Sequence, residues 1–147
     1  MRENEKNGVD YFFISEKMFR KKIACNEFIE YEEVYPHQFY GTMKVEISRM
    51  HSEGKLALFD VDVKGALALK NYFGGNAISI FIKPPSFKIL QKRLESRATE
   101  SQEKIRMRVK KAALEMQYEN KFDCTIINDN LEKAEAEIAK LVSNFLI

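Results

Sequence analysis

The sequence predicts an α/β fold with a parallel sheet flanked by helices, because three apolar runs alternate with helical patterns. The first run, residues 56–59, and the second, residues 77–82, are joined by a helical segment at 66–72, which makes a βαβ unit. The third run, residues 122–127, precedes an amphipathic pattern that predicts a terminal helix. Apolar runs without alternation are typical of parallel strands buried on both faces.

The first run leads into the acidic stretch Asp60-Val61-Asp62, followed by Gly65. Ligands of open α/β sheets bind at the carboxyl ends of strands. Two carboxylates two residues apart in an extended chain project to the same side, so Asp60 and Asp62 are candidates for one site. A solvated turn between strand and helix is the alternative, because such turns are often acidic.

The segment before this stretch predicts a small lobe with a mixed sheet. Aromatic residues at 11–14 predict a strand, Ser15 predicts a helix cap, and the alternation over 28–35 predicts a second strand. A further helix is expected after Thr42, which can cap it, and Gly54 closes that helix.

The segment after 82 predicts three helices. Pro84-Pro85-Ser86 ends a strand and begins a helix, a longer helix carries Ile105 and Val109 inward, and the polar run 128–130 caps the last one.

Composition indicates one domain in a reducing compartment. The 147 residues carry a net charge of +2, and no apolar run approaches the length of a membrane span. Cys25 and Cys124 have no CxxC or Cys/His spacing, so they are expected to be free core thiols of a cytoplasmic protein. Neither His37 nor His51 has neighbours that predict a metal site.

The positive charge is concentrated between residues 83 and 111, where 10 lysines and arginines face 3 acidic residues. Such a segment could bind nucleic acid, handle a polyphosphate, or form a solvated helix face.

Polar residues at the predicted junctions suit a ligand with a phosphate at one end and donor groups at the other. Guanine presents its N1–H and N2–H₂ donors side by side, and one carboxylate can accept both. The alternative for each residue is strand packing or a solvated surface. The donors are Arg2, Tyr11, Tyr40 and Thr42, and the acceptors are Glu30, Asp60 and Asp62.

Seven motifs in order resemble the guanylate kinase family and span nearly the whole chain. They are Asn7-Gly8-x-Asp10-Tyr11-x-Phe13, Asn26-Glu27-Phe28-Ile29-Glu30, Phe39-Tyr40-Gly41-Thr42, Asp60-Val61-Asp62-Val63-Lys64-Gly65, Phe81-Ile82-x-Pro84-Pro85-Ser86, Arg93-Leu94-x-x-Arg97-x-Thr99 and Asn128-Asp129-x-Leu131. The resemblance implies a P-loop NTPase-like fold and the reaction of ATP and GMP to ADP and GDP. It implies a single domain over 1–147, with a GMP-binding lobe at 1–54 and the remaining core at 55–147, including a lid around 93–108.

The resemblance also assigns roles to residues. Glu30, Asp62 and Thr42 would read guanine, and Asp60 would lie near the phosphates and Mg²⁺, for which no protein ligand is identified. The GMP site would also hold Arg2, Tyr11, Tyr40 and Gly41. The phosphoryl group would be clamped by Arg93, Arg97 and Arg108, and ATP would meet Asn128 near its adenine. Small-molecule substrates are therefore expected, with no nucleic acid or membrane partner.

The sequence departs from the family in one respect. Family members begin with a strand, the loop G-x-x-x-x-G-K-[ST] and a helix, and these 147 residues contain no such loop. We therefore expect a chain that lacks this segment, is inactive alone, and can self-associate through unpaired core strands. A binding module that keeps the fold without catalysis is the alternative. The full set of carboxylates and arginines favours a kinase.

Overall fold

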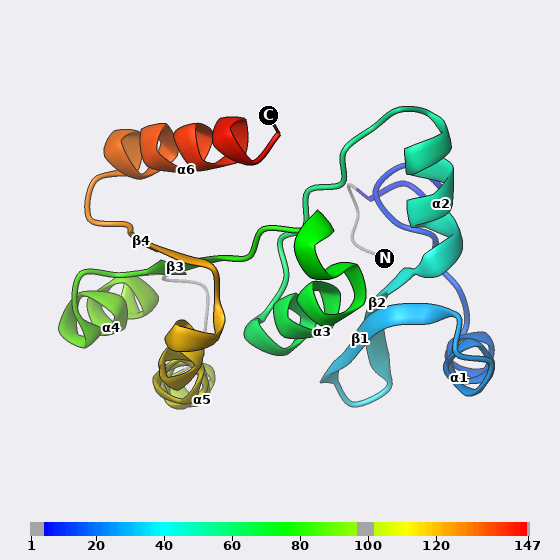
Figure 1. Ribbon diagram of the computed structural model, residues 1–147. Coiled ribbons are helices and arrows are strands. Elements are labelled where there is room, and N and C mark those ends of the chain that lie inside the picture. The colour runs from blue at the N-terminus through cyan, green and yellow to red at the C-terminus, as the bar shows by residue number, and fades with distance from the viewer. Residues whose placement is uncertain (1–4, 97–101, 147) are drawn as a thin grey trace. The chain divides into compact units, whose positions relative to one another are not determined.

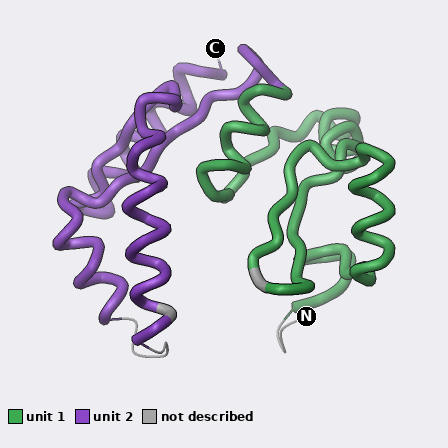
Figure 2. Tube along the Cα trace, turned by 90° about the horizontal axis from the view of Figure 1, so that it is seen from below, with its two compact units in different colours: residues 1–72 green, residues 73–147 purple. Residues whose placement is uncertain are grey.

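The computed structural model describes residues 5–96 and 102–146, which divide into two compact units. Unit 1 comprises residues 1–72 and unit 2 residues 73–147 (Figure 2). The predicted lobe boundary at residue 54 stays a prediction.

Unit 1 is built on an antiparallel hairpin. Strand β1 (Phe28–Tyr35) pairs with β2 (Gln38–Met43), and the register joins Glu30 to Thr42. Helix α1 (Glu16–Ala24) precedes the hairpin, and α2 (Lys44–Ser52) and α3 (Val63–Phe73) follow it (Figure 1). The strand expected over 28–35 is confirmed, while the sheet is antiparallel rather than mixed within the described residues.

Aromatic rings form the core of unit 1. The Phe19 ring of α1 stacks on Phe28 of β1 with 4.3 Å between centroids, and on Phe39 of β2 with 5.3 Å. Phe19 and Phe28 are buried. The Arg20 guanidinium lies 4.7 Å from the centre of the Phe39 ring and covers it from outside.

Two expected strands of unit 1 do not form. Residues 11–14 are not a strand because the Phe13 N–H donates to the Asn7 side chain at 2.8 Å instead of to a strand partner. Residues 56–59 do not form a strand and belong to neither sheet of the described residues, and Leu56 is 71% and Leu58 94% exposed. The expectation that this run is buried on both faces was wrong.

Unit 2 contains a parallel strand pair with helices around it. Strand β3 (Ile80–Lys83) pairs in parallel with β4 (Cys124–Ile127). The connection runs through α4 (Phe87–Glu95), α5 (Gln102–Glu115) and the 3-10 helix η2 (Met116–Lys121). Helix α6 (Leu131–Phe145) follows β4, and η1 (Gly74–Asn76) opens the unit.

Ser79 and Asp123 join the two strands of unit 2 at their starts. The Asp123 carboxylate accepts from the Ser79 N–H at 2.8 Å and from its hydroxyl at 2.7 Å, and the Asp123 N–H donates to the Ser79 hydroxyl at 3.1 Å. Ser79 is buried, so these bonds satisfy polar atoms that water does not reach.

Helix starts were predicted well where a side chain caps them. The side chains of Ser15, Ser86 and Asn130 accept from the backbone three residues later, at the starts of α1, α4 and α6. Caps were expected at Ser15 and at 128–130, and a helix start was expected at Ser86. Thr42 was expected to cap α2 and does not. It lies in β2, and α2 begins after Met43 with no side-chain cap.

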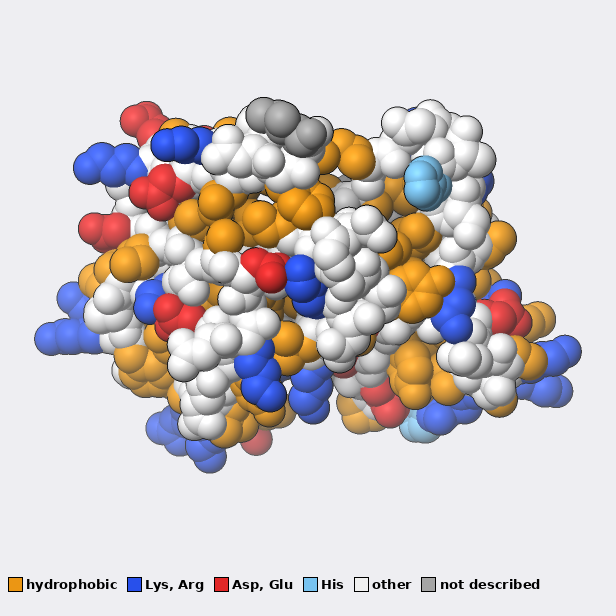
Figure 3. All heavy atoms as spheres, in the orientation of Figure 1, with side chains coloured by type: hydrophobic (Ala, Val, Ile, Leu, Met, Phe, Trp, Pro, Cys, Tyr) orange, Lys and Arg blue, Asp and Glu red, His pale blue; other side chains and the backbone are white. Residues whose placement is uncertain are grey.

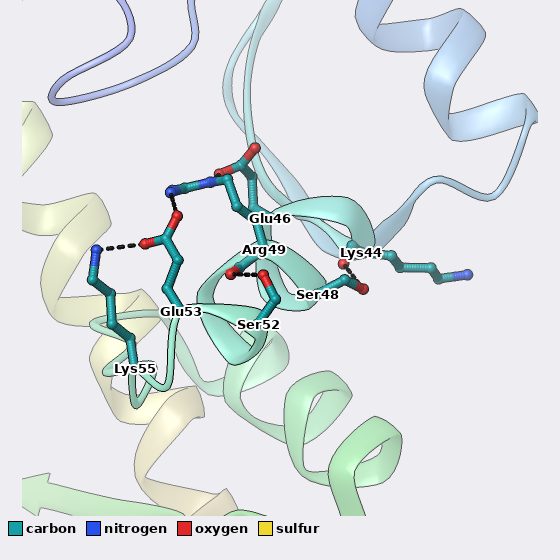
Figure 4. A network of polar contacts seen from close by, with 7 residues as sticks. All are labelled: Lys44, Glu46, Ser48, Arg49, Ser52, Glu53 and Lys55. Carbon is teal, nitrogen blue, oxygen red and sulfur yellow. Dashed lines mark hydrogen bonds and ion pairs between the residues drawn. The ribbon is translucent and has the colours of Figure 1, made fainter.

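A charged network covers α2 and the turn after it (Figure 4). Arg49 donates to Glu46 at 3.0 Å and to Glu53 at 2.7 Å, and Lys55 reaches the second oxygen of Glu53 at 2.5 Å. These bonds lower the pKa of Glu53, with the Lys55 bond the larger cause, and raise that of Arg49. Both side chains are exposed to solvent, so the network contributes little to stability.

The cores of both units are small. The buried apolar side chains of the described residues are Phe19, Phe28, Leu69, Phe81, Ile105, Ile126 and Ala134. Hydrophobic side chains lie at the surface among the charged ones (Figure 3). In the described residues, no helix is long and apolar enough to cross a membrane.

Both cysteines are free, as predicted. Cys124 is partly buried in β4, whereas Cys25 is exposed at the end of α1, so the expectation that both lie in the core was wrong for Cys25.

Candidate nucleotide site

The centre of the candidate site is the Glu30 carboxylate. Its Oε1 accepts a hydrogen bond of 2.7 Å from the Thr42 hydroxyl across the hairpin. Its Oε2 faces the start of α3, 3.3 Å from where a Cβ on Gly65 would stand. Glu30 and Thr42 are both half-buried, so the carboxylate is held in one place by a strand neighbour.

The Asp62 side chain lies at the start of α3, beside the same glycine as the Glu30 carboxylate. Its Oδ1 accepts the Gly65 N–H at 2.9 Å, which is the bond of a helix N-cap, and the same atom lies 3.4 Å from the Cβ position of Gly65. Free N–H groups at a helix N-terminus favour a negative side chain. The Glu30 and Asp62 carboxylates therefore lie together beside Gly65, and Thr42 is bonded to Glu30. All three residues were predicted to read guanine.

The hairpin approaches itself closely at Gly41, beside Thr42. A Cβ at this position would stand 2.8 Å from the Glu30 carbonyl oxygen and 2.9 Å from the Tyr31 Cβ. Because both neighbours belong to the paired strand, any larger residue would push β2 away from β1 and separate Thr42 from Glu30.

Tyr11 and Tyr40 lie together on another part of unit 1. Their rings meet edge to face with 5.7 Å between centroids, and the Tyr11 ring also contacts Phe13 at 5.8 Å. Tyr11 is 48% and Tyr40 41% exposed, so both rings remain accessible to a ligand. The loop before Tyr11 is fixed by the Lys6 N–H, which donates to the Asp10 carboxylate at 2.8 Å.

In unit 2, Arg93 and Asn128 are brought together. The Arg93 guanidinium donates to the Asn128 carbonyl at 2.7 Å and to the Asp129 carbonyl at 3.4 Å. Arg93 is in α4 and Asn128 directly follows β4, whose end is fixed by the Asn128 N–H donating to the Lys83 carbonyl at 2.7 Å. Arg93 was expected to clamp a phosphoryl group. In the structure its guanidinium binds the loop that contains Asn128, the residue expected to contact ATP.

Arg108 lies on α5 and lines a shallow groove of about 230 Å³ between α4 and α5. The groove also has Leu90 and Leu94 of α4 and Glu115 of α5 in its wall. Arg93 does not line this groove.

Some predicted site residues are not brought into these clusters. Asp60 is exposed and precedes the cap formed by Asp62. Arg2 and Arg97 lie outside the described residues, as does the central part of the predicted lid, 97–101.

Two polar pairs of unit 2 were not expected from the sequence. One is Ser79 with Asp123, and the other is Lys83 of β3, which donates to both oxygens of Glu119 at 2.7 and 2.9 Å. The Lys83 bond holds the pKa of Glu119 below its ordinary value of 4.5. These partners are 44 and 36 residues apart, and no spacing rule links residues at that separation.

A group of three or more carboxylate, histidine or cysteine side chains suited to a metal ion does not occur within residues 5–96 and 102–146.

Arginines and carboxylates around a candidate nucleotide site suit phosphoryl transfer, because that reaction depends on positioning and on stabilisation of charge. The guanylate kinase family profile matches residues 1–145 of the chain. The guanylate kinase of Bacteroides fragilis is 48% identical over 145 residues, which is 99% of this chain and 71% of that protein. That of Porphyromonas gingivalis is 46% identical over 99% of this chain and 77% of its own length.

A solved structure agrees with these sequence matches. The crystal structure of guanylate kinase from Anaplasma phagocytophilum matches with a TM-score of 0.75 and 28% identity, over 98% of this chain and 69% of that one. The chain belongs to the guanylate kinase family and has its α/β fold. It is by family a GMP phosphotransferase, as the motifs predicted.

Proposed function

We propose that unit 1 binds GMP with its base against Glu30 and Asp62 and its phosphate near Tyr11 and Tyr40. The observation that carries this proposal is the Glu30 carboxylate, held by Thr42 and placed beside the Asp62 cap of α3. A carboxylate fixed in this way can accept the N1–H and N2–H₂ donors of guanine together, and adenine offers no such pair.

Further GMP contacts are proposed for the remaining residues of the set. Arg2 would reach the GMP phosphate, Gly41 would let the hairpin close around Thr42, and Asp60 would face the phosphate side. The exposure of Asp60 is compatible with this role, because Mg²⁺ keeps several waters and binds through one or two carboxylates plus nucleotide phosphates.

Unit 2 is proposed to serve ATP. Asn128 would lie near the adenine, and Arg97 and Arg108 would stabilise charge on the transferring phosphoryl group. Arg93 shares the phosphoryl role in our sequence-based assignment. To reach a phosphate it must exchange its bonds to the carbonyls of Asn128 and Asp129, so its first effect is on the Asn128 loop.

Isothermal titration of the 147-residue chain with GMP and with AMP tests the base-reading proposal. GMP should bind and AMP should bind at least about tenfold more weakly. Glu30→Ala should weaken GMP by about 1–3 kcal/mol, because two base donors lose their acceptor. Glu33→Gln, a carboxylate of the same strand that accepts from His37 N–H, is the matched control. Equal GMP affinity in wild type and Glu30→Ala removes Glu30 from the site.

We further propose that these 147 residues alone turn over ATP and GMP slowly. They contain no G-x-x-x-x-G-K-[ST] sequence, whose amides and lysine hold nucleotide phosphates. Alignment of reactants contributes roughly 7–11 kcal/mol of barrier reduction in favourable cases. A coupled assay for ADP and GDP should show turnover only when the family's strand, loop and helix are added in front of the chain. Robust turnover without them contradicts the proposal.

A cytoplasmic location and self-association complete the proposal. Both cysteines are free thiols, which suits a reducing compartment. The exposed side chains of Leu56 and Leu58 offer an apolar segment, which favours association between copies. Light scattering over a range of protein concentrations should show mass rising with concentration, and Leu58→Lys should reduce that rise.

A further inference from the structure

Three atoms crowd the α-carbon of Gly65 at the start of α3. A Cβ there would stand 3.2 Å from the Val61 Cβ, 3.3 Å from the Glu30 Oε2 and 3.4 Å from the Asp62 Oδ1. Gly65 is buried, and its φ is not in the left-handed region, so alanine is compatible with the backbone. The glycine is needed for space.

Those neighbours have little freedom to withdraw. The Val61 Cβ is fixed to the backbone, and Asp62 Oδ1 accepts the N–H of Gly65 itself. Glu30 is the most flexible of the three, but its other oxygen accepts the 2.7 Å bond from Thr42. A methyl group on residue 65 would therefore displace the Val61 side chain, the Glu30 carboxylate, or both.

We propose that Gly65 is a specificity-determining positioning residue, which sets the spacing of the Glu30 and Asp62 carboxylates and so the selectivity for guanine. It touches no substrate atom in this role. Because it has no side chain, it leaves space for two carboxylates to lie beside its α-carbon. One is Glu30 of β1, and the other is Asp62 at the start of α3. This inference rests on the proposed GMP site.

The selectivity follows from what each part of the ligand needs. The base donors N1–H and N2–H₂ require the carboxylates at a fixed separation, whereas the ribose phosphate does not. Displacement of Glu30 should therefore weaken the binding of GMP strongly. It should weaken the binding of IMP less, because IMP lacks the exocyclic amine, and leave the affinity for ribose 5-phosphate unchanged.

The test compares Gly65→Ala with Gly75→Ala by isothermal titration with GMP, IMP and ribose 5-phosphate. Gly75 is the matched control, since a Cβ there meets nothing within 4 Å and its φ is not left-handed. Gly65→Ala should weaken GMP about tenfold or more and narrow the ratio of GMP to IMP affinity, while Gly75→Ala changes neither.

A double-mutant cycle separates positioning from loss of fold. In a Glu30→Ala background, Gly65→Ala should have no further effect on the GMP to IMP ratio, because the displaced group is absent. Glu30→Asp combined with Gly65→Ala should recover part of the GMP affinity, since the shorter side chain leaves room for the methyl. If Gly65→Ala alone does not fold, recovery of folding and GMP binding in this double variant supports the proposal.

Three results overturn the inference: GMP affinity of Gly65→Ala within twofold of wild type, equal losses for GMP and ribose 5-phosphate, or no recovery with Glu30→Asp. A wild-type chain that does not bind GMP is a different result, which rejects the proposed function itself.

Discussion

Unit 1 brings together the carboxylates that are proposed to read guanine, whereas in unit 2 the candidate arginines Arg93 and Arg108 have different surroundings. In unit 1 the carboxylates of Glu30 and Asp62 converge on Gly65, and Thr42 holds one of them. In unit 2 Arg93 binds main-chain carbonyls and Arg108 lines a helix groove. Recognition of a base requires hydrogen-bond acceptors at fixed positions. An arginine that stabilises a phosphate can bind another partner before the nucleotide arrives.

The two units also rely on different kinds of interaction for their stability. Stacked rings join α1 to the hairpin in unit 1, while a buried serine and an aspartate join the strands of unit 2. If each unit is stabilised by its own set of contacts, a substitution that removes contacts in one unit should leave the other unit stable.

The largest effect is expected from Phe28→Ala. Removal of a buried ring that stacks at 4.3 Å on Phe19 should destabilise unit 1 by about 3–5 kcal/mol. Hydrogen exchange should show lost protection in residues 16–43 and unchanged protection in β3 and β4. Val45→Ala, which is 61% exposed on α2, should change stability by less than about 0.5 kcal/mol. Equal loss of protection in both units would show that the two units do not depend on separate stabilising contacts.

Asp123→Ala should have the next largest effect, now in unit 2. The variant leaves the buried Ser79 without the acceptor of two hydrogen bonds, which costs about 1–3 kcal/mol. Urea unfolding measures this loss, and Asp129→Ala, an exposed aspartate after β4, is the control. GMP affinity should stay at the wild-type value, since the residues that we propose to bind GMP belong to unit 1. A large drop in GMP affinity would contradict a local effect.

Arg93→Gln should have a smaller effect. It removes two hydrogen bonds to the loop after β4, each worth about 0.5–1.5 kcal/mol at most for an exposed donor. Exchange of the amides at 128–130 should accelerate, while GMP titration is unchanged. Unchanged exchange there would mean that the Arg93 bonds do not order the loop.

The smallest effect is a dependence on pH through Glu119. Lys83 lowers the pKa of this carboxyl from 4.5 in the folded state, so its contribution is complete above 4.5 and is lost as the pH falls through the lower folded value. The stability difference between wild type and Glu119→Gln should shrink as the pH is lowered from about 7 to about 3. A difference that grows over that range would show the opposite sign of linkage.

Local signals in the sequence predicted much of the fold. Alternation over 28–35 and the caps at Ser15, Ser86 and Asn130 depend on residues a few positions apart, and all are found in the structure. The prediction of a buried strand at 56–59 was wrong, because an apolar composition indicates burial only when a partner strand is present.

The candidate site was predicted in its residue types but not in its detail. The motifs identified Glu30, Thr42 and Asp62, while the crowding at Gly65 depends on the distance between β1 and α3, which a sequence pattern does not contain. Ser79 and Asp123 carry no periodic signal, since their pairing follows from the register of β3 and β4.

Each unit carries a single free thiol, Cys25 at the exposed end of α1 and Cys124 partly buried in β4. Because their accessibilities differ, a maleimide dye should react first at Cys25 under native conditions, leaving Cys124 for a second dye after mild unfolding. The natural sequence thus provides two labelling positions, one per unit, for energy-transfer measurements of how far apart the units stand before and after GMP is added.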